Sequence, residues 1–381
     1  MPAPGRTRAP FPLPTPSVLL ALTGLRIGGG IAVVSRCIAR ALDEQVRDGR
    51  LGRTDRVLLL EDPADPASPP TRGEQHLARG SHARFVWQTW RAFRRHRHDL
   101  VLFDLVGLAR SISLPLTGFP PPRIAIFAHG IELAGAHAGA HARALRQAHL
   151  VLANSRFTAD RLAADLPELS DRIRVVPLCI DPERVELWES AERAEAAPRR
   201  ERAALIVGRM WPDERGKGHD ELLAAWSSVR RHVPDAELWI VGTGDDVARL
   251  AAKARDGGAG DAVRFLGRVS DAELGALYRR ASVFAMPSQQ EGFGIVYAEA
   301  MWWGLPCIGT TADAAGQVIV AGETGELVPY RDVAALGRVL VRLLSDRDQA
   351  TRMGEAGRRR AREHFGYRRF RSDLLTALGL D

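Results

Sequence analysis

Cysteine is scarce in this chain of 381 residues. Only Cys37, Cys179 and Cys307 are present, and they lie far apart in the sequence. None of them has a second cysteine or a histidine at the spacing of zinc ligands. The sequence therefore excludes a disulfide framework and a structural zinc module, and it predicts reduced thiols in a cytoplasmic protein.

Long apolar runs are missing as well. A membrane-spanning helix needs about 20 apolar residues, and no segment approaches that length. The run "SVLLAL" stops at Thr23, which is too short for a signal peptide and is better explained by a strand that enters a glycine-rich turn. Residues 1–16, rich in proline and arginine, are expected to form a disordered tail.

Acidic residues are outnumbered by basic ones, 46 to 53, so the net charge is +7. Such an excess suits an anionic ligand, an anionic membrane surface or nucleic acid, and it is also typical of a GC-rich genome. No nucleic-acid-binding module is recognisable. We therefore expect no nucleic-acid partner.

What the sequence does contain is an alternation of short apolar runs and amphipathic stretches from Val18 onward, typical of a parallel sheet with crossover helices. A region with several prolines, residues 61–81, is predicted to be a loop or an insertion. In the first half, strands are predicted at 18–22, 56–60, 100–103, 123–128, 150–153 and 173–177, and helices at 31–45, 83–97 and 158–166.

The alternation restarts after residues 183–200, a charged, alanine-rich segment without a strand pattern. In this second half, strands are predicted at 204–210, 236–244, 262–269, 282–288 and 306–310, and helices at 219–232 ("HDELLAAWSSVRRH"), 247–255, 271–281 and 294–304. We interpret this segment as a partly helical linker between two Rossmann-like domains, 17–182 and 201–363, followed by a C-terminal helix at 364–381. The predicted fold class is α/β. Because such sheets bind ligands at the carboxyl ends of their strands, we expect the two sheets to face each other across a cleft.

Two motifs of the first half follow predicted strands. Three glycines at 28–30 open a helix, where the backbone can approach an anion closely. They do not match the dinucleotide pattern G-x-G-x-x-G, and a plain tight turn is the alternative. His129 ends the strand "RIAIFAHG", where either a ligand-binding or a structural role is open. Asn154 and Ser155 are predicted to cap the next helix.

The third motif is "LIVGRMWPDERGKGHDELL". Arg209 leaves a strand, and Lys217 lies just before a helix. An arginine fork, a lysine point charge and a helix N-terminus together suit a diphosphate. Two solvated surface cations are the alternative.

The fourth motif is "PSQQEGFGIVYAEAMWWGLPCIG". Glu291 precedes a helix start whose N–H groups, from Gly292, Phe293 and Gly294, can bind hydroxyls or phosphate. Glu299 follows about two helical turns later. Because carboxylates accept hydrogen bonds from sugar hydroxyls, the two glutamates are predicted to contact different parts of an elongated ligand.

Taken in order, these motifs resemble the retaining glycosyltransferases of the GT-B fold, the glycosyl transferases group 1 of the family-four type. The resemblance covers nearly the whole chain after residue 17 and includes "AHG", "NSRFTADRL", "VPLCIDPERV", "FLGRVSDAELGALYRRASVFAMPS" and "GETGELVP". It implies a two-domain GT-B enzyme whose last helix returns to the first domain.

The resemblance also implies residue roles. The implied catalytic residues are His129, Arg209, Lys217 and Glu291. The implied donor-binding residues are Gly29, Gly30, Arg209, Lys217, Val269, Glu291, Gly292, Phe293, Gly294 and Glu299. Within these sets, Arg209 and Lys217 would bind the diphosphate, Glu291 the sugar and Glu299 the ribose. Val269 would lie near the base.

Two features depart from the common pattern. The loop "WPDERG" separates the arginine from the lysine by more residues than in many members, so Arg215 is a rival phosphate ligand. The residues "QQ" before Glu291 leave the contacts of that loop open. No Asp-x-Asp motif lies near the site, and we expect an enzyme that needs no metal or other cofactor.

The resemblance implies transfer of a hexosyl group from a nucleotide sugar to a glycan or lipid-linked acceptor. A nucleotide-sugar 2-epimerase and an inactive nucleotide-sugar-binding protein are the alternatives. Residues 83–98, "ARFVWQTWRAFRRHRH", place Val86, Trp90 and Phe93 on one helical face among arginines. This pattern predicts contact with the cytoplasmic face of an anionic membrane, or else a crossover helix packed on its sheet.

Overall fold

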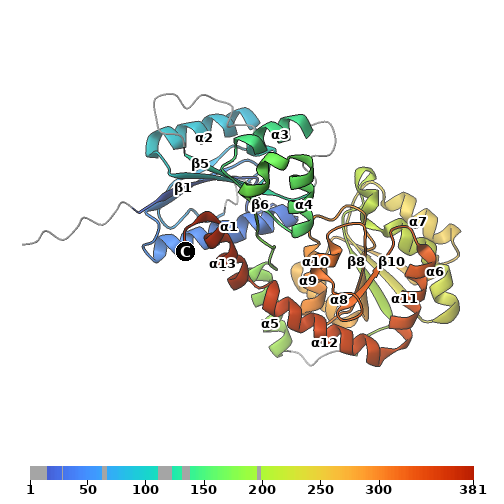
Figure 1. Cartoon of the computed structure of the whole chain (residues 1–381). Helices are drawn as coiled ribbons and strands as arrows, with labels where there is room; N and C mark the ends of the chain where they lie inside the picture. The colour runs from blue at the N-terminus through green and yellow to red at the C-terminus, as the bar shows by residue number, and fades with distance from the viewer. Residues whose placement is uncertain (1–14, 28, 62–66, 110–121, 131–137, 195–198) are drawn as a thin grey trace, which may run out of the picture. The chain divides into compact units, whose positions relative to one another are not determined.

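The computed structural model describes residues 15–27, 29–61, 67–109, 122–130, 138–194 and 199–381. Two compact units are present, one built mainly from the chain up to Ile126 and the other mainly from the chain after it. The strands form two separate sheets, each accompanied by helices (Figure 1). Two Rossmann-like α/β sheets in tandem are the elements of the GT-B fold, as the sequence predicts.

The first sheet has seven strands in the order β3-β2-β1-β4-β5-β6-β7. Its interior strands are apolar and almost fully buried, which is typical of a parallel sheet that is covered on both faces. The strands are β1 (Ser17–Leu22), β2 (Arg53–Leu58), β3 (Gln75–Leu77), β4 (Leu100–Phe103), β5 (Arg123–Ala128), β6 (Leu150–Ala153) and β7 (Ile173–Val175).

The helices of this part are α1 (Gly30–Arg47), α2 (His82–His96), α3 (Ala138–Gln147), α4 (Arg156–Asp165) and a 3-10 turn, η2 (Pro167–Arg172). Each follows its strand through a local start signal. Ser81 caps α2 and Ser155 caps α4, in each case by accepting a backbone N–H. The predicted cap at Ser155 is therefore confirmed.

The prediction of a loop or an insertion at residues 61–81 is wrong in one respect. Gln75–Leu77 forms the short edge strand β3, which pairs in parallel with β2. Its three residues carry little apolar pattern, since none of them is buried, and the strand is defined by its backbone pairing alone. The neighbouring strand β2 also begins three residues earlier than predicted.

The second sheet has six strands in the order β10-β9-β8-β11-β12-β13. Its centre is again apolar, and β8, β11 and β12 are the most deeply buried strands. The strands are β8 (Ala203–Val207), β9 (Glu237–Val241), β10 (Val263–Gly267), β11 (Val283–Ala285), β12 (Cys307–Thr310) and β13 (Gly325–Val328). Sequence reasoning missed β13, which lies at the edge of this sheet.

The helices of this part are α5 (Pro182–Ala194), η3 (Pro212–Lys217), α6 (His219–His232), α7 (Val247–Asp256), η4 (Gly260–Ala262), α8 (Asp271–Arg280), α9 (Ile295–Trp302), α10 (Ala315–Val318), α11 (Val333–Ser345), α12 (Arg347–His364) and α13 (Tyr367–Leu378). Helix α6 packs on α11, and α9 packs on α12. The whole predicted helix "HDELLAAWSSVRRH" matches α6.

The predicted linker contains α5, which packs on α8. Trp188 anchors this contact. Its side chain is fully buried and its indole N–H donates to the carbonyl of Asp271 at 2.9 Å. A side chain at Gly275 would collide with the indole at 2.6 Å, so glycine there makes room for it. The domain limits themselves and the return of the last helix stay predictions.

All three cysteines are buried, and none of them forms a disulfide. In the part of the chain that the structure describes, no helix is long and apolar enough to cross a membrane.

Candidate functional site

The order of the second sheet reverses between β8 and β11, which are hydrogen-bonded neighbours. The chain leaves these two strands toward opposite sides of the sheet, and ligands of such folds bind where this happens, outside the carboxyl ends of the strands. The third and fourth sequence motifs follow these two strands directly. The topology therefore explains why motifs about 80 residues apart in sequence share one edge.

Arg209 and Lys217 occupy the two ends of the loop after β8. Arg209 is well exposed, and its guanidinium pairs with Glu214 at 2.5 Å. Lys217 ends the 3-10 turn η3, one residue before the glycine at which α6 starts. Lys217 thus lies just before a helix start, as predicted, and in this structure each of the two cations is held by a carboxylate.

Gly218 allows the two loops to meet. Its φ of +90° lies in the left-handed region, and a Cβ on it would approach the ring of Pro287 to 2.7 Å. Both facts require glycine at this position. Beside it, the N–H of Gln289 donates to the carbonyl of Gly216 at 2.8 Å. The "QQ" segment is therefore joined to the lysine loop through its backbone.

The paired side chains of Lys217 and Glu291 form the centre of the candidate site. The Nζ–Oε2 distance is 3.1 Å, and the side chains are 24% and 23% exposed. Partial exposure leaves both groups accessible to a ligand, while the pairing keeps them in place before one arrives. An ammonium beside a carboxylate can bind a phosphate oxygen and a sugar hydroxyl, respectively.

Asp313, which sequence reasoning missed, holds the backbone at Glu291 through a hydrogen bond. Its carboxylate accepts the Glu291 N–H at 3.0 Å, the Ser288 hydroxyl at 2.6 Å and the Ala315 N–H at 3.0 Å. Burial raises the pKa of the Asp313 carboxyl, and these three donors oppose the rise. The only trace in the sequence is an aspartate two residues before a helix, a common turn pattern.

The start of α9 follows Glu291 directly. Gly294 precedes the helix with a φ of +82°, and a Cβ there would collide with the Tyr297 ring at 2.4 Å. Phe293 is buried and packs edge-on against Phe365. The phenyl ring therefore has a packing role, while the backbone of residues 292–294 forms the helix start.

Glu299 lies in a different cluster from Glu291. It is 2% exposed, and its two oxygens accept hydrogen bonds from Arg184 at 2.5 Å and Tyr278 at 3.1 Å. Burial raises the pKa of the Glu299 carboxyl, and the Arg184 charge is the largest opposing cause. Val269, half-buried between β10 and α8, lies two residues before Asp271, the second partner of Arg184.

Arg215 is engaged elsewhere. Its guanidinium forms two hydrogen bonds with Asp246, at 2.8 and 3.0 Å. Arg249 binds the same carboxylate and also Asp220. Because Lys217 lies at Glu291 while Arg215 lies at Asp246, the geometry favours Lys217 for the phosphate role.

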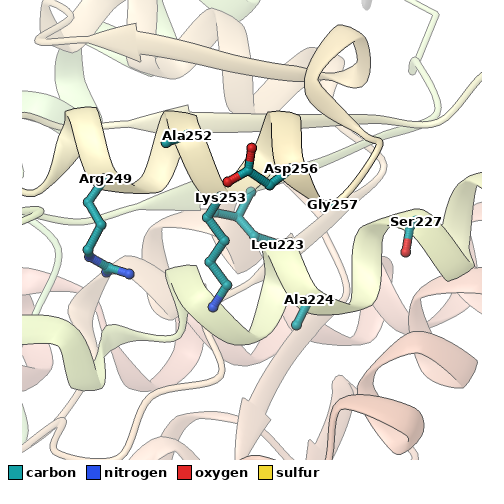
Figure 2. A pocket seen from close by; sticks show the side chains of 8 residues that line it. All are labelled: Leu223, Ala224, Ser227, Arg249, Ala252, Lys253, Asp256 and Gly257. Carbon is teal, nitrogen blue, oxygen red and sulfur yellow. The ribbon is translucent and has the colours of Figure 1, made fainter.

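A pocket of about 420 Å³ opens between α6 and α7 (Figure 2). Small residues such as Ala224, Ala252 and Gly257 line it, and its two cations, Arg249 and Lys253, both bind Asp220. No predicted site residue lines this pocket. The two cations of the pocket are therefore engaged by carboxylates of the protein.

His219, a further residue that sequence reasoning missed, is buried next to the lysine loop. A Cβ on Gly208 would lie 3.4 Å from the Lys217 chain and 3.5 Å from the His219 ring, so these side chains fill the space beside the end of β8. Burial, followed by the charge of Lys217, lowers the pKa of His219 to about 4. The imidazole is therefore neutral near pH 7.

The first sheet reverses in the same way, between β1 and β4. The glycine loop follows β1. Gly28 lies outside the described residues, whereas Gly29 precedes α1 with a φ of +105° and Gly30 is its first residue. A Cβ on either of the last two would meet nothing within 4 Å. Their freedom from contact is compatible with a ligand-facing turn.

Two buried carboxylates hold the start of that loop, and sequence reasoning missed both. Glu61 accepts the N–H groups of Leu25 and Arg26 at 2.8 and 3.2 Å. Asp104 accepts the Thr23 N–H at 2.7 Å and the Ser35 hydroxyl at 2.6 Å. The start of the loop is therefore held mainly through backbone N–H groups, with the Thr23 hydroxyl as a further donor to Asp104 at 3.1 Å.

His129 lies at the carboxyl end of β5, as predicted, and its ring stacks on Phe127 at 5.3 Å. The amide of Asn154 donates to the His129 carbonyl at 3.2 Å. The side chain of Asn154 thus connects the ends of β5 and β6, which is a different role from the predicted helix cap.

Comparisons with known proteins agree with this geometry. Residues 189–360 match the family described as "Glycosyl transferases group 1", and residues 28–184 match "Glycosyltransferase Family 4". Among solved structures, sucrose-phosphate synthase from Thermosynechococcus elongatus has a TM-score of 0.75 at 21% identity, over 96% of this chain and 98% of that one.

Two relatives come from Mycobacterium tuberculosis. A GDP-mannose-dependent alpha-(1-6)-phosphatidylinositol monomannoside mannosyltransferase is 35% identical over 54% of this chain and 54% of its own length. A glycogen synthase is 31% identical over 74% of this chain and 67% of its own length. The chain spans about half the length of the first of these relatives.

Proposed function

Because the chain belongs to the glycosyl transferases group 1 family, we propose that it transfers a hexosyl group from a nucleotide sugar to a glycan or lipid-linked acceptor. The proposal includes retention of the anomeric configuration and a role in the synthesis of cell-envelope polysaccharide or glycoconjugate. The proposed donor is a nucleotide sugar such as GDP-mannose or UDP-glucose, and the name of one relative, which is GDP-mannose-dependent, supports the first of these.

The observation that carries this proposal is the pairing of Lys217 with Glu291 at the reversal point of the second sheet. In the transfer, the bond between sugar C1 and the diphosphate oxygen breaks, a bond from C1 to the acceptor oxygen forms, and the acceptor hydroxyl releases its proton to water. The diphosphate leaves with an added negative charge. We propose that Lys217 and Arg209 neutralise this charge.

The remaining roles follow from the family. Glu291 contacts the donor sugar beside the N–H groups at the start of α9, and Glu299 binds the ribose. The backbone at Val269 lies near the base. In the first sheet, His129 lines the reacting face of the sugar, and the glycines at 29 and 30 approach phosphate or acceptor.

A donor screen tests the proposal. Thermal shift of the purified chain with UDP, GDP and ADP sugars is expected to reveal one preferred base, and NMR of the mixture with acceptor is expected to show a new glycoside with the donor's anomeric configuration. C2 epimerisation of the donor without transfer would identify the alternative epimerase. Binding without hydrolysis or transfer would identify an inactive binding protein.

We also propose that transfer needs no divalent metal, because the two cations at the loop after β8 can supply the positive charge that a metal ion otherwise provides. The expected result is unchanged turnover in excess EDTA. Activity that disappears in EDTA and returns with magnesium or manganese would contradict this proposal.

Membrane contact through α2 is part of the proposed function. The inner face of this helix packs Phe85 and Phe93 into the core, so the crossover role accounts for part of the aromatic pattern. Trp87, however, is 51% exposed, and Arg91 lies over its ring at 5.1 Å. Arg94 lies over the Trp90 ring at 4.8 Å.

Such an exposed aromatic and cationic face suits the interface of an anionic membrane, where each arginine adds about 1 kcal/mol. A cytoplasmic enzyme with a lipid-linked acceptor would use it to reach its substrate. Liposome co-sedimentation at low salt is expected to show binding to anionic vesicles that weakens with salt and with Arg94→Glu plus Arg95→Glu. No binding of the unaltered chain at low salt would contradict it.

A further inference from the structure

Arg184, on the helix that joins the two sheets in sequence, reaches the carboxylate of Glu299. We propose that Arg184 is a positioning residue of the donor site, which keeps Glu299 ionised and oriented for the ribose hydroxyls of a nucleoside diphosphate. The inference rests on the proposed function, because that function assigns the ribose to Glu299.

The geometry fixes the guanidinium from two sides. It donates to Glu299 Oε1 at 2.5 Å and pairs with Asp271 Oδ1 at 2.7 Å. One turn further along α5, the buried indole of Trp188 anchors the helix on α8. Because the backbone of α5 is held here, the direction of the Arg184 side chain is set independently of any ligand.

The carboxylate keeps free acceptor capacity in this arrangement. Each oxygen of a carboxylate has two lone pairs. Oε1 receives Arg184 and Oε2 receives the Tyr278 hydroxyl, which leaves one lone pair on each oxygen. Under the proposed function, two neighbouring ribose hydroxyls donate to these remaining positions.

Ionisation of Glu299 depends on the guanidinium. The residue is 2% exposed, and a buried carboxyl without a cationic partner takes up a proton. Tyr278 supplies a hydrogen bond but no charge, so Arg184 is the group that opposes protonation most strongly, as its leading place among the causes that lower the Glu299 pKa indicates. A protonated carboxyl would be a weaker acceptor for the ribose.

Calorimetric titration of the full chain with UDP and with GDP tests the proposal, using whichever the unaltered chain binds. The ratio of the dissociation constants of variant and unaltered chain is measured from pH 6.5 to 9, so that titration of the nucleotide cancels. For Arg184→Gln, the expected ratio is about ten at pH 6.5, falling toward one as rising pH ionises Glu299 again.

Three further variants make the result specific. Arg184→Lys keeps the charge and is expected to give a small ratio that does not change with pH. Tyr278→Phe removes a neutral partner of the same carboxylate and is expected to behave likewise. Arg193→Gln changes an exposed arginine on the same helix and is expected to bind as the unaltered chain does.

A ratio near one for Arg184→Gln at every pH would overturn the inference, and so would a large ratio that does not change with pH. If Arg184→Gln does not fold, Arg184→Lys still tests the inference. A ratio of dissociation constants that changes with pH in that variant would show that a positive charge alone does not keep Glu299 ionised. Glu299→Ala separates this inference from the proposed function. Normal nucleotide binding by that variant would refute the ribose assignment itself.

Discussion

The two sheets reverse their strand order in the same way. They differ in the protein groups that lie at the point of reversal. After β8 and β11, the second sheet presents charged side chains, with Lys217 and Glu291 partly exposed. Beside the loop after β1, the first sheet has two buried carboxylates, Asp104 after β4 and Glu61 after β2, and both bind backbone N–H groups of that loop. One half offers side-chain charge, and the other offers a shaped backbone.

Under the proposed function, this difference matches the ligand that each half is expected to recognise. A nucleoside diphosphate has a constant charge pattern, which fixed cations and carboxylates can match. Acceptors vary more in shape than in charge, and a loop held by buried carboxylates can change its exposed residues without losing its conformation. Donor binding is therefore readable from motifs, whereas acceptor choice is not.

The strongest test of the comparison is Lys217→Ala. Losing one preorganised charge-stabilising group is expected to lower kcat by about 10²–10³, measured as nucleoside diphosphate released per enzyme. Arg215→Ala is the matched control, because it removes a cation from the same loop that binds Asp246 instead. A larger loss for Arg215→Ala than for Lys217→Ala would reverse the assignment.

The next test separates the two glutamates of the second half. Glu291→Ala is expected to lower kcat by about 10², because the proposed function places its carboxylate at the reacting sugar. Glu299→Ala is expected to raise the donor KM about tenfold with a smaller change in kcat, since an interaction with the ribose is made equally before and during transfer. Steady-state kinetics with varied donor would distinguish the roles, and the opposite pattern would contradict them.

The sequence points to Lys217 and Glu291 as site residues because their chemistry is carried by the residue type and by neighbouring glycines. It did not identify Asp313 or Glu61, since each acts through hydrogen bonds to the backbone of a distant segment. Arg184 was hidden for another reason. The sequence of its helix, α5, predicts a charged linker. Only the packing of Trp188 on α8 shows where this helix lies.

The secondary-structure predictions also succeeded where the residue pattern is strong and failed where it is weak. Elements with strong apolar periodicity, such as α6 and β5, were predicted residue for residue. The edge strands β3 and β13 were missed, because an edge strand is short and only partly buried, so its sequence carries little pattern.

A test within the first half asks whether the glycine loop after β1 contributes to acceptor binding. Glu61→Gln replaces an oxygen that accepts N–H groups with an amide that can offer a donor to them, so the loop is expected to shift. The expected result is an acceptor KM raised about tenfold with the donor KM unchanged. An equal rise in both values would show that the loop does not act on the acceptor alone.

The smallest expected effect concerns charges of the second half that serve stability. Hydrogen bonds from Arg249, then from Lys253, lower the pKa of Asp220 to about 2, against 3.8 ordinarily. A lowered pKa stabilises the fold above pH 4 and loses that contribution as pH falls toward 2. Asp220→Asn is expected to cost about 1–2 kcal/mol of unfolding free energy at pH 7.

Urea unfolding at pH 7 and at pH 3 measures the free energy of unfolding of Asp220→Asn and of the unaltered chain. The difference between these two free energies is expected to be smaller at pH 3. Unchanged turnover would show that charge in this half is divided between stability and chemistry. A loss of turnover as large as that of Lys217→Ala would mean that the division does not exist.

The packing of Trp188 against Gly275 has a practical consequence for dissecting the molecule. A recombinant fragment meant to contain the second sheet cannot begin at β8, because it would leave an empty slot on α8 where the indole belongs. Emptying a site filled by a buried tryptophan costs about 3–5 kcal/mol, a large part of the stability of a small domain. Such a fragment has to start ahead of Pro182 and carry α5 with it.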